Sequence, residues 1–284
     1  PHVLTFISDV KLPPDSSDRQ RREALANWIV SPKNPLTARV IVNRVWQYHF
    51  GVGLVETSSD FGLNGATPSH PKLLDWLAQE FINSGWSIKQ LHRLIMTSET
   101  YCQAAIQSDA GNAVDAGNRL LWHFPNRRLE AESIRDSILA ISGNLNLKQG
   151  GPGFNFFKTR GGLSGFPEVE EFTSNELRRM IYAHKIRMEP VPIFGAFDCP
   201  DAGLPTPRRS QSTTAIQALN LFNSSFVIDQ AEQLAKRCEE EAGPKVFDQI
   251  QLAFQLVVGR SPSAVEIDAI TEIVQQHGLA TLCR

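Results

Sequence analysis

A stretch from residue 34 to residue 62, NPLTARVIVNRVWQYHFGVGLVETSSDFG, constrains the fold of this chain more than any other. Asn34 is a good N-cap and Pro35 suits the first helical position, so a helix is predicted to begin here. The glycines that follow predict a turn. A helix that is apolar nearly all round is buried, and the apolar positions of this one are Leu36, Ala38, Val40, Ile41, Val42, Val45, Trp46, Tyr48 and Phe50.

The same helix carries polar side chains that burial would remove from water. Asn43, Arg44, Gln47 and His49 all fall on it. Buried polar groups need hydrogen-bonding partners, so we expect other segments to supply carbonyls and carboxylates to them. This predicts a structural polar core, and the residues assigned to it are Asn43, Gln47, His49, Gln217 and Asn220.

The composition is that of an ordinary globular chain of 284 residues, with 42% hydrophobic and 20% charged residues. A formal net charge of −2 gives no electrostatic case for nucleic acid, and no apolar run is long enough to span a membrane. The four cysteines form no CxxC pair, so free thiols are expected. The chain starts at Pro1, and we expect it to be an excised piece of a longer protein, cut short near Arg284.

Helical periodicity predicts a mainly α, irregular multi-helix single domain over residues 1–284 with little β structure. Residues 144–176 lack a clear period and are rich in glycine and phenylalanine, and residues 144–210 are expected to form a long irregular insertion. The best strand candidate is residues 180–188, where side chains alternate. Helices are expected at about 18–30, 35–50, 71–83, 88–95, 129–142, 213–221, 225–241, 245–258 and 264–276. Capping boxes are expected at three helix starts, and a Ser212 or Thr213 cap at a fourth; the boxes are Ser17 with Gln20, Ser87 with Gln90 and Ser263 with Glu266.

The predicted helix at 129–142 combines an apolar face with a charged one. Leu129, Ile134, Ile138 and Ile141 mark the apolar face. On the other face, Glu132 lies four residues after Arg128 and three before Arg135. This spacing predicts an ion-pair ladder within the helix.

Five blocks of this sequence resemble a known family. They are the 34–62 stretch, PSHPKLLDWLAQEF, GWSIKQLHRLIMTSETY, RRLEAESIRDSILAISG and RRSQSTTAIQALNLFNSSFV, in that order. Together they resemble the planctomycete domain of unknown function, of the DUF 1553 type, that is found C-terminal to cytochrome-c-like domains. The polar motif positions of the family fall here on Asn43, Arg44, Gln47, His49, His70, Asp75, Arg93, Tyr101, Arg128, Glu132, Arg135, Asp136, Asp198, Arg208, Gln217 and Asn220.

The resemblance implies a module of a large exported protein, placed at the cell surface or in the periplasm. Its neighbours in the same polypeptide would include haem-c modules and, in some members, carbohydrate-binding-like modules. The resemblance implies no activity and no cofactor. The sequence departs from the usual family pattern in the 153–176 insertion and at Cys199.

A metal site is one alternative for the histidines. His49 and His70, with Asp60 or Asp75, would be its ligands. No HExxH or comparable ligand pair occurs, so the favoured interpretation is that the histidines form hydrogen bonds and that no metal is bound.

Acid–base catalysis is a second alternative. Glu132 and Asp136, one helical turn apart, would work with Asp198. Anions would be held by Arg44, Arg128, Arg135 and Arg208. The simpler interpretation is an ion-pair network in which the carboxylates satisfy the arginines.

Three functions are considered from the sequence, and a docking surface for a cytochrome is the third of them. The favoured one is a non-catalytic structural or interaction domain of a protein with cytochrome-c-like modules, which organises neighbouring domains or binds a partner. The alternative is a hydrolase that acts on a polysaccharide or its sulfated ester through the cluster of arginines and carboxylates.

Overall fold

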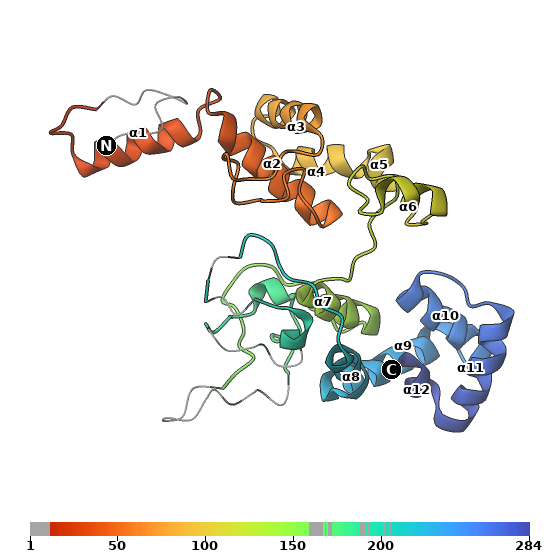
Figure 1. The fold of residues 1–284 in the computed structure, drawn as a ribbon. Coiled ribbons are helices and arrows are strands. Elements are labelled where there is room, and N and C mark those ends of the chain that lie inside the picture. The colour runs from red at the N-terminus through yellow and green to blue at the C-terminus, as the bar shows by residue number, and fades with distance from the viewer. Residues whose placement is uncertain are drawn as a thin grey trace. The chain divides into compact units, whose positions relative to one another are not determined.

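The computed structural model describes residues 12–158, 167, 169, 172–187, 191, 194–200, 203–204 and 206–284. In this part of the chain there are twelve α-helices, two short 3₁₀ helices and two isolated β-bridges, and no sheet. The prediction of a mainly helical fold with little β structure is confirmed. Contacts divide the chain into two compact units, which we name unit 1 (Pro1–Arg127) and unit 2 (Arg128–Arg284) (Figure 1).

Unit 1 is built around α2, which packs against α3 and α4. Val42 and Trp46 of α2 share a hydrophobic core with Leu77 and Phe81 of α3 and Leu91 of α4. The helices of this unit are α1 (Asp18–Ile29), α2 (Pro35–Phe50), α3 (Pro71–Asn83), α4 (Ile88–Met96), α5 (Glu99–Cys102) and α6 (Asp109–Asp115).

Local sequence sets both ends of α2. The side chain of Asn34 accepts a hydrogen bond from the Leu36 N–H at 3.0 Å, and Pro35 occupies the first turn. Gly51 ends the helix with a φ of 84°, a left-handed conformation that glycine adopts without steric cost. The predicted helix and its turn are therefore present.

The prediction that α2 is buried on all sides is wrong. Tyr48 is 62% exposed, and Arg44 is exposed as well. The partners of α2 cover one side of the helix, through Val42, Trp46 and Phe50. The opposite side meets solvent even though part of it is apolar.

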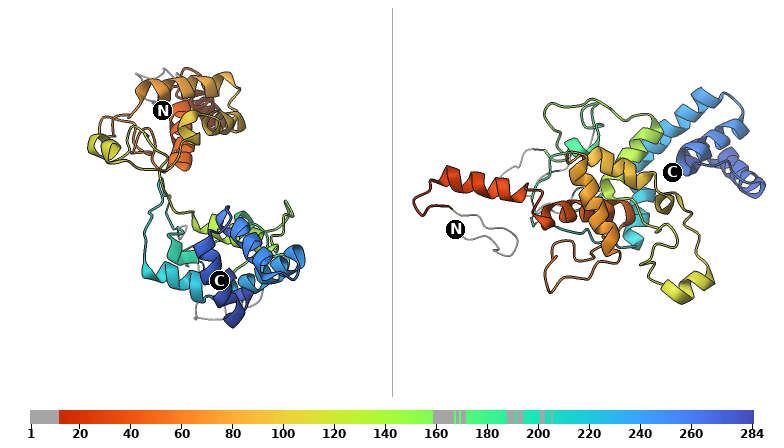
Figure 2. Two further views of the ribbon diagram at one scale, coloured as in Figure 1. Left: turned by 90° about the vertical axis from the view of Figure 1, so that its right-hand side faces the viewer. Right: turned by 90° about the horizontal axis from the view of Figure 1, so that it is seen from above.

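Unit 2 is organised around α9, which contacts α7, α8, α10 and α12. Figures 1 and 2 show α10, α11 and α12 gathered beside α9. The elements of this unit are α7 (Ala131–Ser142), η1 (Met180–Tyr182), η2 (Phe194–Phe197), α8 (Ala215–Asn223), α9 (Ser225–Ala242), α10 (Val246–Val258), α11 (Ala264–His277) and α12 (Leu279–Cys283). Across the described residues of both units, no helix has the length and apolarity that crossing a membrane requires.

The long irregular segment, residues 144–210, has only η1 and η2 as regular elements among its described residues. It is nevertheless packed, because Phe154, Phe156 and Phe157 are buried in a core shared with Leu139 of α7 and Phe226 of α9. Phe166 and Met188 belong to the same segment and lie outside the described residues.

The predicted strand at residues 180–188 is wrong where the chain is described. Met180–Tyr182 form η1, because the N–H groups of Tyr182 and Ala183 bond back to the carbonyls of Arg179 and Met180. Only an isolated bridge between Phe154 and Ala183 remains of the expected pairing. Alternating side chains alone do not make a strand where no neighbouring strand offers a ladder of hydrogen bonds.

Candidate functional site

Glu132 and Asp136 lie one turn apart near the start of α7 and line the same cavity of unit 2. The cavity has a volume of about 370 Å³. Its remaining walls come mostly from the segment around η1 and from residues near η2 and α8, and the lining residues with reactive or charged side chains are Glu130, Arg179, His184, Lys185, Cys199 and Arg209. This cavity brings together two of the three predicted catalytic carboxylates.

Arg209 holds the two glutamates at the rim of the cavity. Its Nη1 atom lies 2.6 Å from Glu132 Oε2 and 3.1 Å from Glu130 Oε2. Burial acts to raise the pKa of Glu132, but the hydrogen bonds from Arg209 and from its own backbone N–H, together with the charges of Arg209 and Lys185, outweigh burial, so this pKa lies below its usual value. Glu132 is therefore an ionised, paired carboxylate at neutral pH, which does not suit the role of a general acid.

Asp136 is engaged by the backbone of η1. Its Oδ1 atom accepts a hydrogen bond from the Met180 N–H at 2.8 Å. The guanidinium groups of Arg135 and Arg179 each lie 3.6 Å from one of its oxygens. Asp136 thus fixes the start of η1 against α7.

Asp198 is not among the residues that line this cavity. Its Oδ2 atom accepts hydrogen bonds from Arg128 at 2.6 Å and from the Ser212 N–H at 2.8 Å. Burial acts against ionisation, but the bonds from Ser212 and the charge of Arg128 hold the pKa of Asp198 below its usual value. The three carboxylates predicted to act together are therefore divided, with two in the cavity and one bound elsewhere.

The predicted ladder within α7 is also wrong. Arg128 pairs with Asp198, and Glu132 pairs with Arg209, both distant in sequence. Arg135 is fully buried and points away from Glu132 into the core. The predicted apolar face of α7 is present at Ile134, Ile138 and Ile141, which pack against the hydrophobic cores of unit 2, but Leu129 is 57% exposed and precedes the helix.

Arg135 donates to the backbone carbonyls of Glu176 and Arg178. Its guanidinium carbon also lies 5.3–5.8 Å from the centroids of three phenylalanine rings. Burial lowers the pKa of Arg135 to about 10, partly offset by Asp136. The predicted role of Arg135 as an anion holder is wrong, because no part of the side chain reaches solvent.

Arg178 is a second buried arginine, which the sequence reasoning missed. It is 1% exposed and donates to the carbonyls of Lys148, Pro152 and Gly150 at 3.2, 2.9 and 2.6 Å. Its guanidinium carbon lies 3.9 Å from the centroid of the Tyr182 ring. The glycine-rich run at 150–153 was the one available signal, since its exposed carbonyls need donors.

The other two predicted anion holders lie outside the cavity. Arg44 is exposed on α2, and within the described residues it makes no ion pair. Arg208 is exposed too, and its neighbour Arg209 is the one that reaches the cavity. On α2 it is Arg39, not Arg44, that meets a carboxylate, with Nε 2.7 Å from Asp75 Oδ1.

The predicted polar core is divided between the two units. In unit 1, Asn43 is fully buried and exchanges hydrogen bonds of 2.9 and 2.8 Å with the backbone of Val55, and Gln47 is buried beside it on α2. In unit 2, Gln217 is buried and donates to the Ala196 carbonyl, while Asn220 is half-buried on α8. The partners of Asn43 and Gln217 are mainly backbone groups, not carboxylates.

His49 lies against a different histidine from the one predicted. Its Nε2 atom is 2.7 Å from Nδ1 of His92, whereas His70 hydrogen-bonds with the adjacent Ser69. Burial, together with His92 and Arg127, lowers the pKa of His49. Among the described residues no group of three or more His, Cys, Asp or Glu could hold a metal ion, so the proposed set of His49, His70 and Asp60 or Asp75 does not assemble.

Cys199 is the most reactive type of side chain in the cavity. Lys185 Nζ lies 2.8 Å from Cys199 Sγ, and Glu132 Oε1 lies 3.8 Å from the same sulfur. Burial raises the pKa of the Cys199 thiol, and Lys185 opposes this only in part while Glu132 adds to it. The thiol is therefore mainly protonated at neutral pH.

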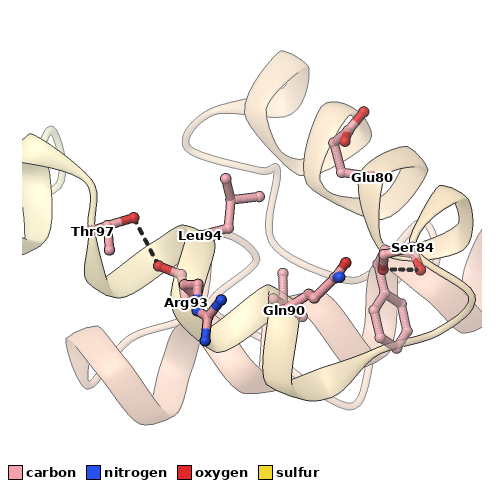
Figure 3. Close-up of a pocket in the computed structure, with 8 residues that line it drawn as sticks. Glu80, Ser84, Gln90, Arg93, Leu94 and Thr97 are labelled. Atoms are coloured by element: carbon pink, nitrogen blue, oxygen red, sulfur yellow. Dashed lines mark hydrogen bonds between the residues drawn. The ribbon is translucent and has the colours of Figure 1, made fainter.

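A further cavity, of about 340 Å³, lies between α3 and α4 of unit 1 (Figure 3). Glu80 and Arg93 lie at its rim, and Leu94 and Phe81 form part of its wall. The hydroxyl groups of Ser84 and Thr97 donate to the carbonyls of Phe81 and Arg93 within their own helices. The hydroxyls are thus already bonded, and the cavity holds no nucleophile with an adjacent base.

The family model described as PSD1, protein of unknown function (DUF1553), matches residues 21–274. The chain therefore belongs to this family of uncharacterised proteins. The matched residues come from both units, so one family region extends across them. No curated protein and no solved structure matches the chain.

Proposed function

We propose that this chain is a non-catalytic structural and interaction module whose irregular segment, residues 144–210, serves as its binding surface. The observation that carries the proposal is the pair of buried arginines. Arg178 holds three backbone carbonyls and Arg135 holds two more, all of them in residues 148–178. Buried charges used in this way order a segment that has no regular secondary structure of its own.

The paired state of the remaining ionic groups supports the same proposal. Glu132 is bound by Arg209, Asp136 by the η1 backbone and Asp198 by Arg128 and Ser212. A carboxylate committed to a structural partner is a poor proton donor for a substrate. The contacts of these carboxylates are thus explained by their structural partners, and no catalytic role is needed to account for them.

The family resemblance supports a proposal for the larger protein in which this module occurs. In this proposal it belongs to a large exported protein of planctomycete type, placed C-terminal to a cytochrome-c-like domain, and the neighbouring domains are its partners. The loop side chains of the irregular segment would contact them, since rigidly held loops commonly carry binding residues.

The test is binding between this module and the neighbouring cytochrome-c-like domain, measured by titration calorimetry. Arg178→Met is expected to weaken binding at least tenfold, because the carbonyls at residues 148–152 lose their donor. Arg260→Met changes the same residue type in unit 2 but outside this segment, where the side chain is 53% exposed, and is expected to leave binding unchanged. No binding by the unmodified module, or equal effects of the two substitutions, would contradict the proposal.

One observation favours a second function, a hydrolase of polysaccharides or their sulfated esters. Glu132 and Asp136 do share an open cavity, with Arg209 and Lys185 beside them to hold an anionic group. The decisive assay is turnover of sulfated and unsulfated polysaccharides. Turnover that Glu132→Gln abolishes and Glu130→Gln preserves would replace the structural proposal with the hydrolase.

A further inference from the structure

An amine and a thiol are in direct contact in the cavity, those of Lys185 and Cys199. Lys185 follows η1 and Cys199 follows η2, and Nζ lies 2.8 Å from Sγ. Both residues line the cavity of about 370 Å³, so a small solute can reach the sulfur. Neither residue is needed for the carbonyl contacts of Arg135 and Arg178.

The contacts around the Lys185 amine and the Cys199 thiol position them for reaction with each other. The Lys185 ammonium donates a hydrogen bond to the sulfur, so its nitrogen already faces Sγ. Glu132 Oε1 lies 3.8 Å from the same sulfur and can accept the thiol hydrogen bond. Arg209 fixes Glu132 through a contact of 2.6 Å, so the carboxylate cannot turn away easily.

We propose that Cys199 and Lys185 form a redox-controlled cross-link: a hydroperoxide oxidises Cys199 to the sulfenic acid, and the amine of Lys185 then closes an S–N bond with it. The product is a sulfenamide, a known condensation product of sulfenic acids with nitrogen. It would tie the residues after η1 to those after η2, and so lock the irregular segment.

The two steps balance. In the first, the thiol sulfur attacks the hydroperoxide, the O–O bond breaks, and the products are the sulfenic acid of Cys199 and an alcohol, or water where the oxidant is hydrogen peroxide. In the second, the Lys185 ammonium gives a proton to solvent, its nitrogen attacks Sγ, and the S–O bond breaks. The hydroxyl leaves with an amine proton as water, so the linked pair has lost two hydrogen atoms overall. A dithiol reverses the link by attack at the sulfur.

Cys102 provides a control within the same chain. Cys102 is exposed, and its thiol donates a hydrogen bond to the backbone carbonyl of Met96 instead of contacting an amine. We expect peroxide to oxidise Cys102 without joining it to a lysine. Cys238 is fully buried and should stay reduced.

The experiment treats the intact chain with hydrogen peroxide, blocks the remaining thiols, and maps digested peptides by mass spectrometry. The expected result is one joined species that contains Lys185 and Cys199, lighter than the two free peptides by two hydrogen atoms and released by a dithiol. Its yield should rise from neutral to alkaline pH, because thiolate and free amine both become more abundant. Recovery of Cys199 as sulfinic acid with an unjoined Lys185, or as an unreacted thiol, would overturn the proposal.

Lys185→Arg tests the role of the amine while keeping the positive charge. A guanidinium stays protonated and cannot supply the attacking nitrogen. We expect this variant to accumulate sulfinic acid at Cys199, whereas Cys102→Ser should form the cross-link as before. The peptide map of the unmodified chain decides the proposal even if the Lys185 variant fails to fold.

Discussion

The guanidinium of Arg135 donates a hydrogen bond of 2.9 Å to the backbone carbonyl of Arg178, and both side chains are buried in unit 2. Arg178 continues the chain of contacts to the carbonyls of residues 148, 150 and 152. Carbonyls of a segment that lacks helix and sheet need other donors, and a guanidinium offers five N–H groups. The two arginines thus supply these carbonyls with hydrogen-bond donors, which in a β-sheet would come from the backbone N–H groups of neighbouring strands.

Loss of the Arg178 guanidinium should destabilise unit 2 strongly. Arg178→Met removes a buried guanidinium that donates to the carbonyls of Lys148, Gly150 and Pro152 and packs on the Tyr182 ring, and we expect it to lower the free energy of unfolding by about 3 kcal/mol or more. Chemical denaturation followed by circular dichroism measures this. Arg179→Met should change it by less than about 1 kcal/mol, since the Arg179 contact with Asp136 is long and largely exposed. Equal losses for the two variants would contradict the role assigned to Arg178.

Asn43 should be the most sensitive polar residue of unit 1. Asn43→Ala leaves the N–H and carbonyl of Val55 unpaired in the core, at a cost of at least about 2 kcal/mol. All five tryptophans lie in unit 1, so their fluorescence reports the unfolding of this unit. Asn83→Ala, at an exposed helix end, should cost less than about 0.5 kcal/mol.

Unit 1 should lose stability as the pH falls through the ordinary histidine range. The pKa of His49 is lowered in the folded state by burial, by His92 and by Arg127, so the unfolded state binds protons first. The loss therefore begins near the unfolded value of 6.5 and levels off below the folded pKa of His49. His49→Gln should flatten this dependence, as read from tryptophan fluorescence. His277→Gln, exposed in unit 2, should leave it unchanged.

Removal of the Glu132 charge should make Cys199 more reactive. Glu132 contributes to the raised pKa of the thiol, so Glu132→Gln should lower this pKa and speed alkylation at neutral pH. Glu130 pairs with the same Arg209 but is not among the groups that shift the thiol, so Glu130→Gln is the matched control. Alkylation rates at Cys199, followed by mass spectrometry, measure both. An unchanged rate in Glu132→Gln would contradict the electrostatic account of the cavity.

Helix ends were predictable because their determinants are local. Ser17 with Gln20 and Ser263 with Glu266 form the expected capping boxes. At the start of α4, Ser87 accepts a hydrogen bond from the Gln90 N–H, without the reciprocal bond of a capping box. One end shifted: α8 is capped by Thr214, not by Ser212 or Thr213. Ser212 is bonded instead to Asp198, fourteen residues earlier, and that contact has no local signal.

The ionic partners were not predictable from helical spacing. The spacing on α7 predicted that Glu132 would meet Arg128 and Arg135. Glu132 meets Arg209 instead, 77 residues away, and Arg128 meets Asp198, 70 residues away. A surface ion pair between residues one helical turn apart contributes little to stability. The direction of such a side chain is therefore determined by a buried or half-buried partner from another segment.

Hydrogen exchange of the unmodified chain tests the central claim most directly, because it asks whether the segment held by Arg135 and Arg178 is ordered. The N–H groups of Phe154 and His184 bond to the carbonyls of Tyr182 and Phe154. If the arginines order this segment, peptides that cover residues 144–158 and 176–187 will be protected to within about tenfold of peptides from α7. Exchange of these peptides as fast as that of an unstructured chain would contradict the account.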